Sequence, residues 1–120
     1  MGMETAMAYE MQNRRTPQDV SAENLGFDIR SVDEEKQEIC YIEVKARAGT
    51  GPVALTQKEW FKAQRFKDAY YLYAVMNAAT GPQLYRLKNP AENLKPEERV
   101  EVVRYVVQSE QIKAKGEKTA

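Results

Sequence analysis

The spacing of apolar residues along the chain changes several times, and each change predicts a different element. Residues 3–14 carry methionines at helical spacing with no internal Gly or Pro, which predicts a helix. A short strand is predicted at 18–20. Residues 27–32 and 37–47 alternate apolar and polar side chains, which predicts two strands joined by the polar turn 33–36.

The second half of the chain predicts another helix and more strands. Thr56 is a good helix N-cap, and Glu59 three residues later completes a capping box, so a helix is expected from there to about residue 66. Residues 69–76 form a nearly continuous apolar run, typical of a central strand that is buried on both faces. Two further strands are predicted at 83–87 and 100–107.

This order of elements indicates an α/β fold, with a mixed sheet flanked by helices. The 120 residues suffice for one domain, expected at 1–108, and the polar residues 109–120 are expected to fray. Hydrophobic residues make up 42% of the chain and charged residues 30%, with a net charge of zero. That composition is typical of a globular protein.

Charged residues interrupt the two strands of the predicted hairpin. Asp28, Glu43 and Lys45 lie among residues that normally build a buried sheet, where unpaired charge is costly. Because side chains alternate along a strand, Glu43 and Lys45 share one face. A turn centred on 33–36 would pair Asp28 with Tyr41, which places Asp28 on that same face about 7–8 Å from Glu43. A turn one residue longer or shorter would move Asp28 to the other face.

Two carboxylates and a lysine on one face favour a hydrolytic metal site. Asp28, Glu43 and the carbonyl of Val44 are the predicted ligands, and Lys45 would orient water or offset charge on a phosphate. The chain has no histidine, so oxygen ligands point to Mg²⁺, with Mn²⁺ as a substitute. The alternative is structural: Asp28 pairs with a neighbouring cation, and the other two residues form a solvated strand face.

This arrangement of an Asp and a Glu-x-Lys on adjacent strands resembles the PD-(D/E)XK nuclease superfamily. More closely, the chain is similar to the family formed by the C-terminal domain of protein NO VEIN. The similar blocks are 8–10, 17–21, 24–29, 42–47, 55–56, 59–60 and 71–75. The resemblance implies an α-β-β-β-α-β core of the restriction-endonuclease type. It also implies a helix-borne acid, Glu10, beside the metal, and a place at the end of a larger helicase-like protein.

A second set of candidates is basic. Lys58, Lys62 and Arg65 recur on one face of the predicted helix, and Arg47 could extend that surface toward a nucleic-acid backbone. DNA is the expected substrate and RNA an open alternative. A solvated helix face would show the same pattern. A net charge of zero is unusual for an autonomous nucleic-acid binder, and it suits a domain that receives its substrate from a tethered helicase or a partner.

Two functions are therefore in competition: a metal-dependent nuclease, and a catalytically silent module of the same fold that docks nucleic acid or protein. The longest apolar runs are far shorter than the roughly 18–20 residues of a membrane span. The first residues lack the apolar stretch of a signal peptide. The lone Cys40 is compatible with a reducing compartment, so we expect a cytoplasmic protein without membrane contact.

Overall fold

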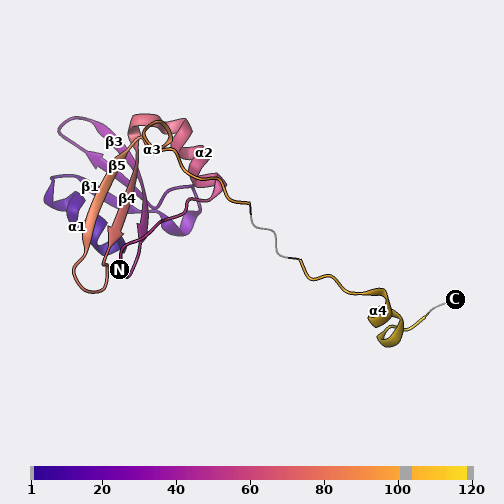
Figure 1. Cartoon of the computed structure of the whole chain (residues 1–120). Coiled ribbons are helices and arrows are strands. Elements are labelled where there is room, and N and C mark those ends of the chain that lie inside the picture. The colour runs from indigo at the N-terminus through magenta and orange to yellow at the C-terminus, as the bar shows by residue number, and fades with distance from the viewer. Residues whose placement is uncertain (1, 101–103, 119–120) are drawn as a thin grey trace.

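The computed structural model describes residues 2–100 and 104–118 (Figure 1). It contains one five-stranded sheet in the order β1-β2-β3-β4-β5. Neighbouring strands are antiparallel except for β3 and β4, which run parallel. The strands are β1 (Thr16–Asp19), β2 (Ile29–Asp33), β3 (Glu38–Ala46), β4 (Tyr70–Met76) and β5 (Gln83–Lys88).

Helices cover both faces of this sheet. The larger ones are α1 (Gly2–Gln12) and α2 (Gln57–Phe66). The shorter helices of the chain are η1 (Ser21–Glu23), η2 (Lys67–Ala69), α3 (Pro90–Asn93) and α4 (Ser109–Lys115), of which α4 does not cover the sheet. A parallel pair needs a long crossover, and α2 with η2 supplies it between β3 and β4. The order from α1 to β4 is therefore the predicted α-β-β-β-α-β, and β5 is added at the edge.

The core is divided by the sheet into two apolar clusters. On one face Ala6 of α1 packs with Ile42 and Tyr73. On the other, Ala63 of α2 packs with Phe27 and Tyr70. Alternation along the strands produces this division: Ile42 points toward α1, so Glu43 and Lys45 point toward α2.

Most predicted elements lie within a few residues of their expected bounds. The capping box is confirmed: Thr56 Oγ1 accepts from the Glu59 N–H at 3.2 Å, and Glu59 Oε1 accepts from the Thr56 N–H at 2.8 Å. The apolar run at 69–76 is confirmed as a central strand, since β4 lies between β3 and β5 and is buried over most of its length.

The predicted register of the hairpin is wrong by two residues. Arg30, not Asp28, pairs with Tyr41, and the pairing ends at Ile29 with Ile42; Asp28 precedes β2, and its N–H donates to the Ile42 carbonyl at 2.8 Å. The reason is the turn, because Gln37 has a left-handed φ of 55° and belongs to the turn, leaving Asp33 and Glu38 to close the hairpin. Asp28 nevertheless stays near Glu43, because its Oδ2 accepts from the Val44 N–H and its charge acts on the Glu43 carboxyl.

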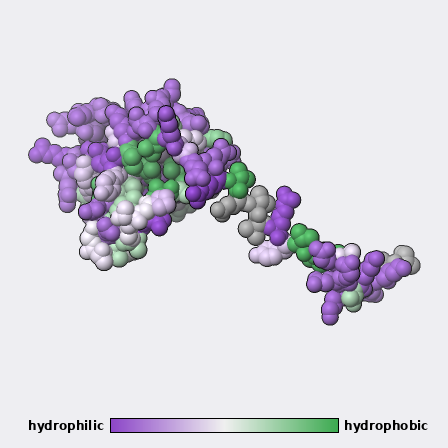
Figure 2. Space-filling view, viewed as in Figure 1, coloured by the Kyte–Doolittle hydropathy of each residue, from purple (hydrophilic) through white to green (hydrophobic). Residues whose placement is uncertain are grey.

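The strand predicted at 100–107 is also wrong over its described residues. Residues 100 and 104–107 are exposed and belong to no strand; residues 101–103 of that predicted strand lie outside the described residues. Residues 109–115, expected to fray, form α4, which is exposed along its length and stands apart from the sheet in Figure 1. Apolar side chains along this stretch, such as Val106 and Ile112, are exposed. Figure 2 shows scattered green atoms along this part of the chain. Among the described residues, no helix has the length and apolar character needed to cross a bilayer.

Candidate metal and hydrolytic site

Asp28 is placed by the loop that enters β2. Gly26 has a φ of +87°, a conformation that favours glycine, and its carbonyl accepts a hydrogen bond from the buried Tyr70 hydroxyl at 2.9 Å. Asp28 then joins β3 twice. Its N–H donates to the Ile42 carbonyl at 2.8 Å, and its Oδ2 accepts from the Val44 N–H at 2.9 Å. The carboxylate is thereby fixed beside β3, just before the first residue of β2.

Glu43 is the buried acid of this face, with a relative exposure of 3%. Burial disfavours its charged form, and the nearby carboxylates of Glu59 and Asp28 add to that effect, which together raise the pKa of Glu43 to about 9. The Lys45 ammonium, 3.4 Å from Glu43 Oε1, opposes the shift without cancelling it. Without a cation the Glu43 carboxyl is therefore protonated at neutral pH, and Glu59 accepts its hydrogen bond.

Lys45 lies between two acids. Its Nζ is 2.9 Å from Glu59 Oε1 and 3.4 Å from Glu43 Oε1. Burial alone would lower the pKa of Lys45, but the bond to Glu59 and the charge of Glu43 raise it above its ordinary value. Burial would likewise raise the pKa of Glu59, and its hydrogen bonds from Glu43 and the Thr56 backbone lower it instead. Lys45 is therefore a fixed cation.

The sequence pattern did not indicate Glu59 as a site residue, because its position in the capping box already accounted for a glutamate there. The Glu59 carboxylate takes part in both the cap and the site: Oε1 accepts from the Thr56 N–H and pairs with Lys45. Its distance along the chain from Glu43 gave no sign of this contact. The block shared with the NO VEIN family at 59–60 was the one available signal.

The predicted ligands fit a hard divalent cation in their chemistry. Asp28, bonded to the Val44 N–H, and the neighbouring Glu43 supply carboxylate oxygens. The Val44 N–H donates to Asp28, just before β2 begins. The Val44 carbonyl points to the same side of β3, because the N–H and C=O of one strand residue face the same neighbouring strand. Within residues 2–100 and 104–118 no three Asp, Glu, Cys or His side chains converge as a ready cluster. Two carboxylates and one carbonyl suffice to bind Mg²⁺, because Mg²⁺ keeps several water molecules as ligands.

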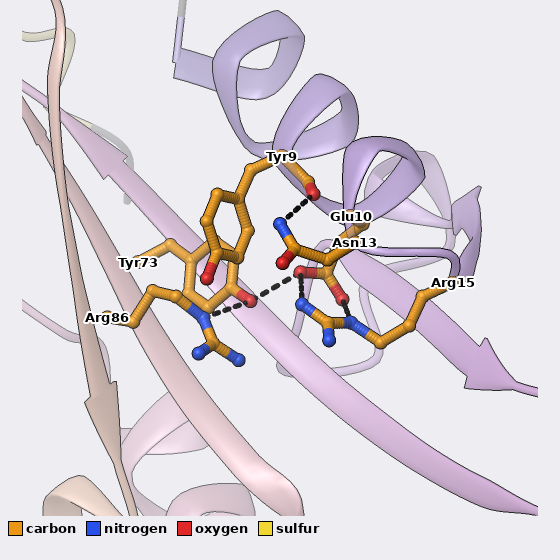
Figure 3. Close-up of polar contacts among 6 residues, drawn as sticks. All are labelled: Tyr9, Glu10, Asn13, Arg15, Tyr73 and Arg86. Carbon is orange, nitrogen blue, oxygen red and sulfur yellow. Dashed lines mark hydrogen bonds and ion pairs between the residues drawn. The ribbon is translucent and has the colours of Figure 1, made fainter. Parts of the chain in front are cut away.

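The structure does not bring Glu10 to this group. Glu10 lies on α1, on the opposite face of the sheet, and is fully buried. Arg15 donates to both of its oxygens, at 2.6 and 2.8 Å, and the Tyr73 hydroxyl donates to Oε2 at 2.6 Å (Figure 3). Burial would raise the pKa of Glu10, but these donors lower it below its ordinary value. Glu10 is thus an ionised structural acid of the α1 face.

The predicted basic surface lies partly in contact with the protein itself. Lys58 donates to the Asn24 carbonyl, and Lys62 lies 5.3 Å from the centre of the Phe66 ring. Arg47 donates to the Pro52 carbonyl at 2.7 Å and so closes the loop after β3. Arg65 is exposed on α2. Lys58, Lys62 and Arg65 thus carry positive charge on α2, and Arg47 carries it on the loop after β3.

Fold and site together define an α/β domain with the element order of a restriction-endonuclease-like core and an Asp, a Glu and a Lys on one face of its sheet. Residues 1–87 match the family described as Protein NO VEIN, C-terminal, and the chain belongs to that family. No curated protein and no solved structure matches the chain.

Proposed function

We propose that this domain is a metal-dependent nuclease of the PD-(D/E)XK type that hydrolyses phosphodiester bonds in DNA. The observation that carries the proposal is Lys45, held as a cation between Glu43 and Glu59, with the Asp28 carboxylate close by on the Val44 N–H. A hydrolase of phosphodiesters needs this combination of acids that hold a cation and a fixed positive charge near the phosphate.

Each residue has its own task. Asp28 and Glu43, with the Val44 carbonyl, would hold Mg²⁺ or Mn²⁺, which in such sites acidifies water and neutralises phosphate charge. Glu43 must release its proton when the cation enters, since burial and the neighbouring acids favour its neutral form. Lys45, kept protonated by Glu59, would donate to the attacking water or to a phosphate oxygen.

The basic residues would guide the substrate. Arg65 and Lys58 of α2 carry exposed charge beside the site, and Lys62 and Arg47 extend it. Such charges contribute sequence-independent attraction to a phosphate backbone. Because the net charge is zero, we infer that a helicase-like segment of a larger protein or a separate partner delivers the DNA. The lone Cys40 suits a reducing, cytoplasmic setting.

The test is cleavage of single-stranded, duplex and flapped DNA with Mg²⁺ or Mn²⁺. Lys45→Ala should lower the rate by on the order of 10²–10³ while leaving cation binding largely intact. Lys36→Ala, in the turn between β2 and β3, is the matched control and should cleave normally. Ca²⁺ should bind and support little turnover, since its looser coordination positions water poorly. Equal rates for wild type and Lys45→Ala would contradict the proposal.

One observation favours the silent docking module instead. The described residues bring together two carboxylates of the predicted set, not three, and Glu43 is neutral without a cation. A domain of that kind would bind DNA equally well with and without divalent ions. Absence of cleavage on every substrate, together with such binding, would establish it.

A further inference from the structure

Arg86 on β5 is enclosed by three tyrosines on the α1 side of the sheet. The central carbon of its guanidinium lies 4.8 Å from the centre of the Tyr71 ring, 5.0 Å from Tyr9 and 5.3 Å from Tyr73. Its Nε donates to the Tyr73 hydroxyl at 2.8 Å (Figure 3). Cation–π contacts and this hydrogen bond hold the guanidinium in one orientation.

The network behind Arg86 leaves its charge uncompensated. Glu10 is already neutralised by Arg15, which donates to both of its oxygens. The Tyr73 hydroxyl gives its proton to Glu10, so toward Arg86 it acts as an acceptor without charge. Among the described residues this is the one side-chain hydrogen bond of Arg86, and its Nη groups remain for an external acceptor. A fixed guanidinium with free donors suits a phosphate.

A cavity of about 320 Å³ lies where β3 and β4 begin, and two neighbours of Arg86, Tyr71 and Lys88, line it. Tyr71 belongs to both features, as a wall of the cavity and as the ring beneath Arg86. Lys88 also lines the cavity and pairs with Tyr71 in the sheet, as Arg86 pairs with Tyr73. Arg86 and Lys88 therefore project from the same side of β5.

The rest of the cavity wall combines apolar surface with acceptors. Cys40 and Ile39 of β3 contribute the apolar part, and Glu38 and Asp68 place carboxylates at the wall. The Asp68 carboxylate accepts from the Asn89 side chain at 3.1 Å, which fixes its position. A simple anion would be repelled by these acids. A ligand that joins a phosphate to a ring bearing N–H or O–H donors would satisfy both groups.

We propose that this cavity binds one nucleotide unit, with the base against Tyr71 and the phosphate on Arg86 and Lys88. Glu38 and Asp68 would accept from amino or sugar hydroxyl groups. The volume lies at the lower end of the roughly 300–1,000 Å³ of small-molecule sites, which suits a single nucleotide. The nucleotide can come from two sources, a free mononucleotide or the end of a strand. The site is independent of the nuclease proposal, because Asp28, Glu43 and Lys45 are not among the residues that line it and it needs no divalent ion.

Amide NMR spectra of the full chain, titrated in EDTA with dAMP and separately with a 5′-phosphorylated deoxyadenosine oligonucleotide, test the proposal. Shifts at Cys40, Tyr71 and Lys88 are expected with dAMP in the micromolar-to-millimolar range. Tighter binding of the oligonucleotide at the same residues would identify a strand end as the source, and equal binding a free nucleotide. EDTA removes any contribution from the Glu43 face.

Variants separate this site from general charge. Arg86→Gln should weaken dAMP binding by on the order of tenfold, as expected for loss of a charged hydrogen bond. Because Arg86 also supports Tyr73, Lys88→Gln is the second variant; Lys88 lies outside that network and is expected to weaken binding severalfold without loss of folding. Lys36→Gln is the control and should bind normally. Shifts absent from the cavity residues, inorganic phosphate bound as tightly as dAMP, or unchanged binding by Lys88→Gln would each overturn the proposal.

Discussion

The carboxylate of Asp28 accepts a hydrogen bond from the backbone N–H of Val44, with 2.9 Å between Oδ2 and N. This bond joins β3 to the residue just before Ile29, the first residue of β2, by means of a side chain. It keeps one oxygen of Asp28 on β3 and the acid near Glu43. The remaining oxygen, Oδ1, is the one we expect to face a cation.

The substitution Asp28→Asn should therefore preserve the fold and abolish binding of the divalent cation. An asparagine carbonyl can still accept from the Val44 N–H, so we expect little loss of stability. Divalent-ion binding should become undetectable, because one of the two predicted carboxylate ligands has been replaced by a neutral amide. Isothermal titration with Mn²⁺ measures this, with Glu34→Gln in the exposed turn as the control. Retained Mn²⁺ affinity in Asp28→Asn would place the ion elsewhere.

The ion-free domain should become less stable as pH rises. The folded pKa of Glu43, about 9, lies above the ordinary value of 4.5, so between these values the folded protein holds a proton that the unfolded chain has released. Stability from this group is complete below the lower value and is lost toward the upper one, with a slope of up to about 1.4 kcal/mol per pH unit.

Urea unfolding in EDTA at pH 6, 7 and 8 measures that slope. Glu43→Gln keeps a neutral side chain of the same shape at every pH and should flatten the dependence. Glu35→Gln, an exposed neighbour in the turn, should retain it. A flat profile in the wild-type protein would show that Glu43 is ionised without a cation.

Tyr73→Phe should destabilise the α1 face. The change removes the donor to Glu10 Oε2 and the acceptor for Arg86 Nε in one step. Leaving a buried charged acceptor short of a partner costs about 1–3 kcal/mol. The measurement is the free energy of unfolding, and Tyr85→Phe at an exposed position of β5 serves as the control. A cost no larger than that of the control would show that Arg15 alone satisfies Glu10.

Thr56→Ala should affect both the helix and the site. Loss of the cap should cost about 1 kcal/mol of stability, and Thr56→Ser should recover most of it. Because Glu59 is held by the same capping box, the alanine variant should also loosen its contact with Lys45. Unfolding measures the first effect, and the pH dependence of cleavage measures the second. Thr50→Ala, in the exposed loop, is the control.

Local pattern in the sequence determined most of the elements and the face of the key charges. The capping box defined α2 because both of its bonds form within one helical turn. Alternation placed Glu43 and Lys45 together because it depends only on strand geometry. Asp28 remained near Glu43 despite the wrong register, because its side chain bonds the Val44 N–H.

Contacts between distant segments were decided by the tertiary structure alone. The pairing of Lys45 with Glu59 depends on how the loop from 47 to 56 returns α2 to the sheet, which no local pattern encodes. Glu10 is separated from Glu43 by the sheet itself, because α1 packs on the face of Ile42 and Tyr73. The strand predicted at 100–107 illustrates the same limit: residues with strand propensity, such as Tyr105 and Val106, form no strand where the fold offers them no partner, because β structure requires hydrogen bonds from a neighbouring chain segment.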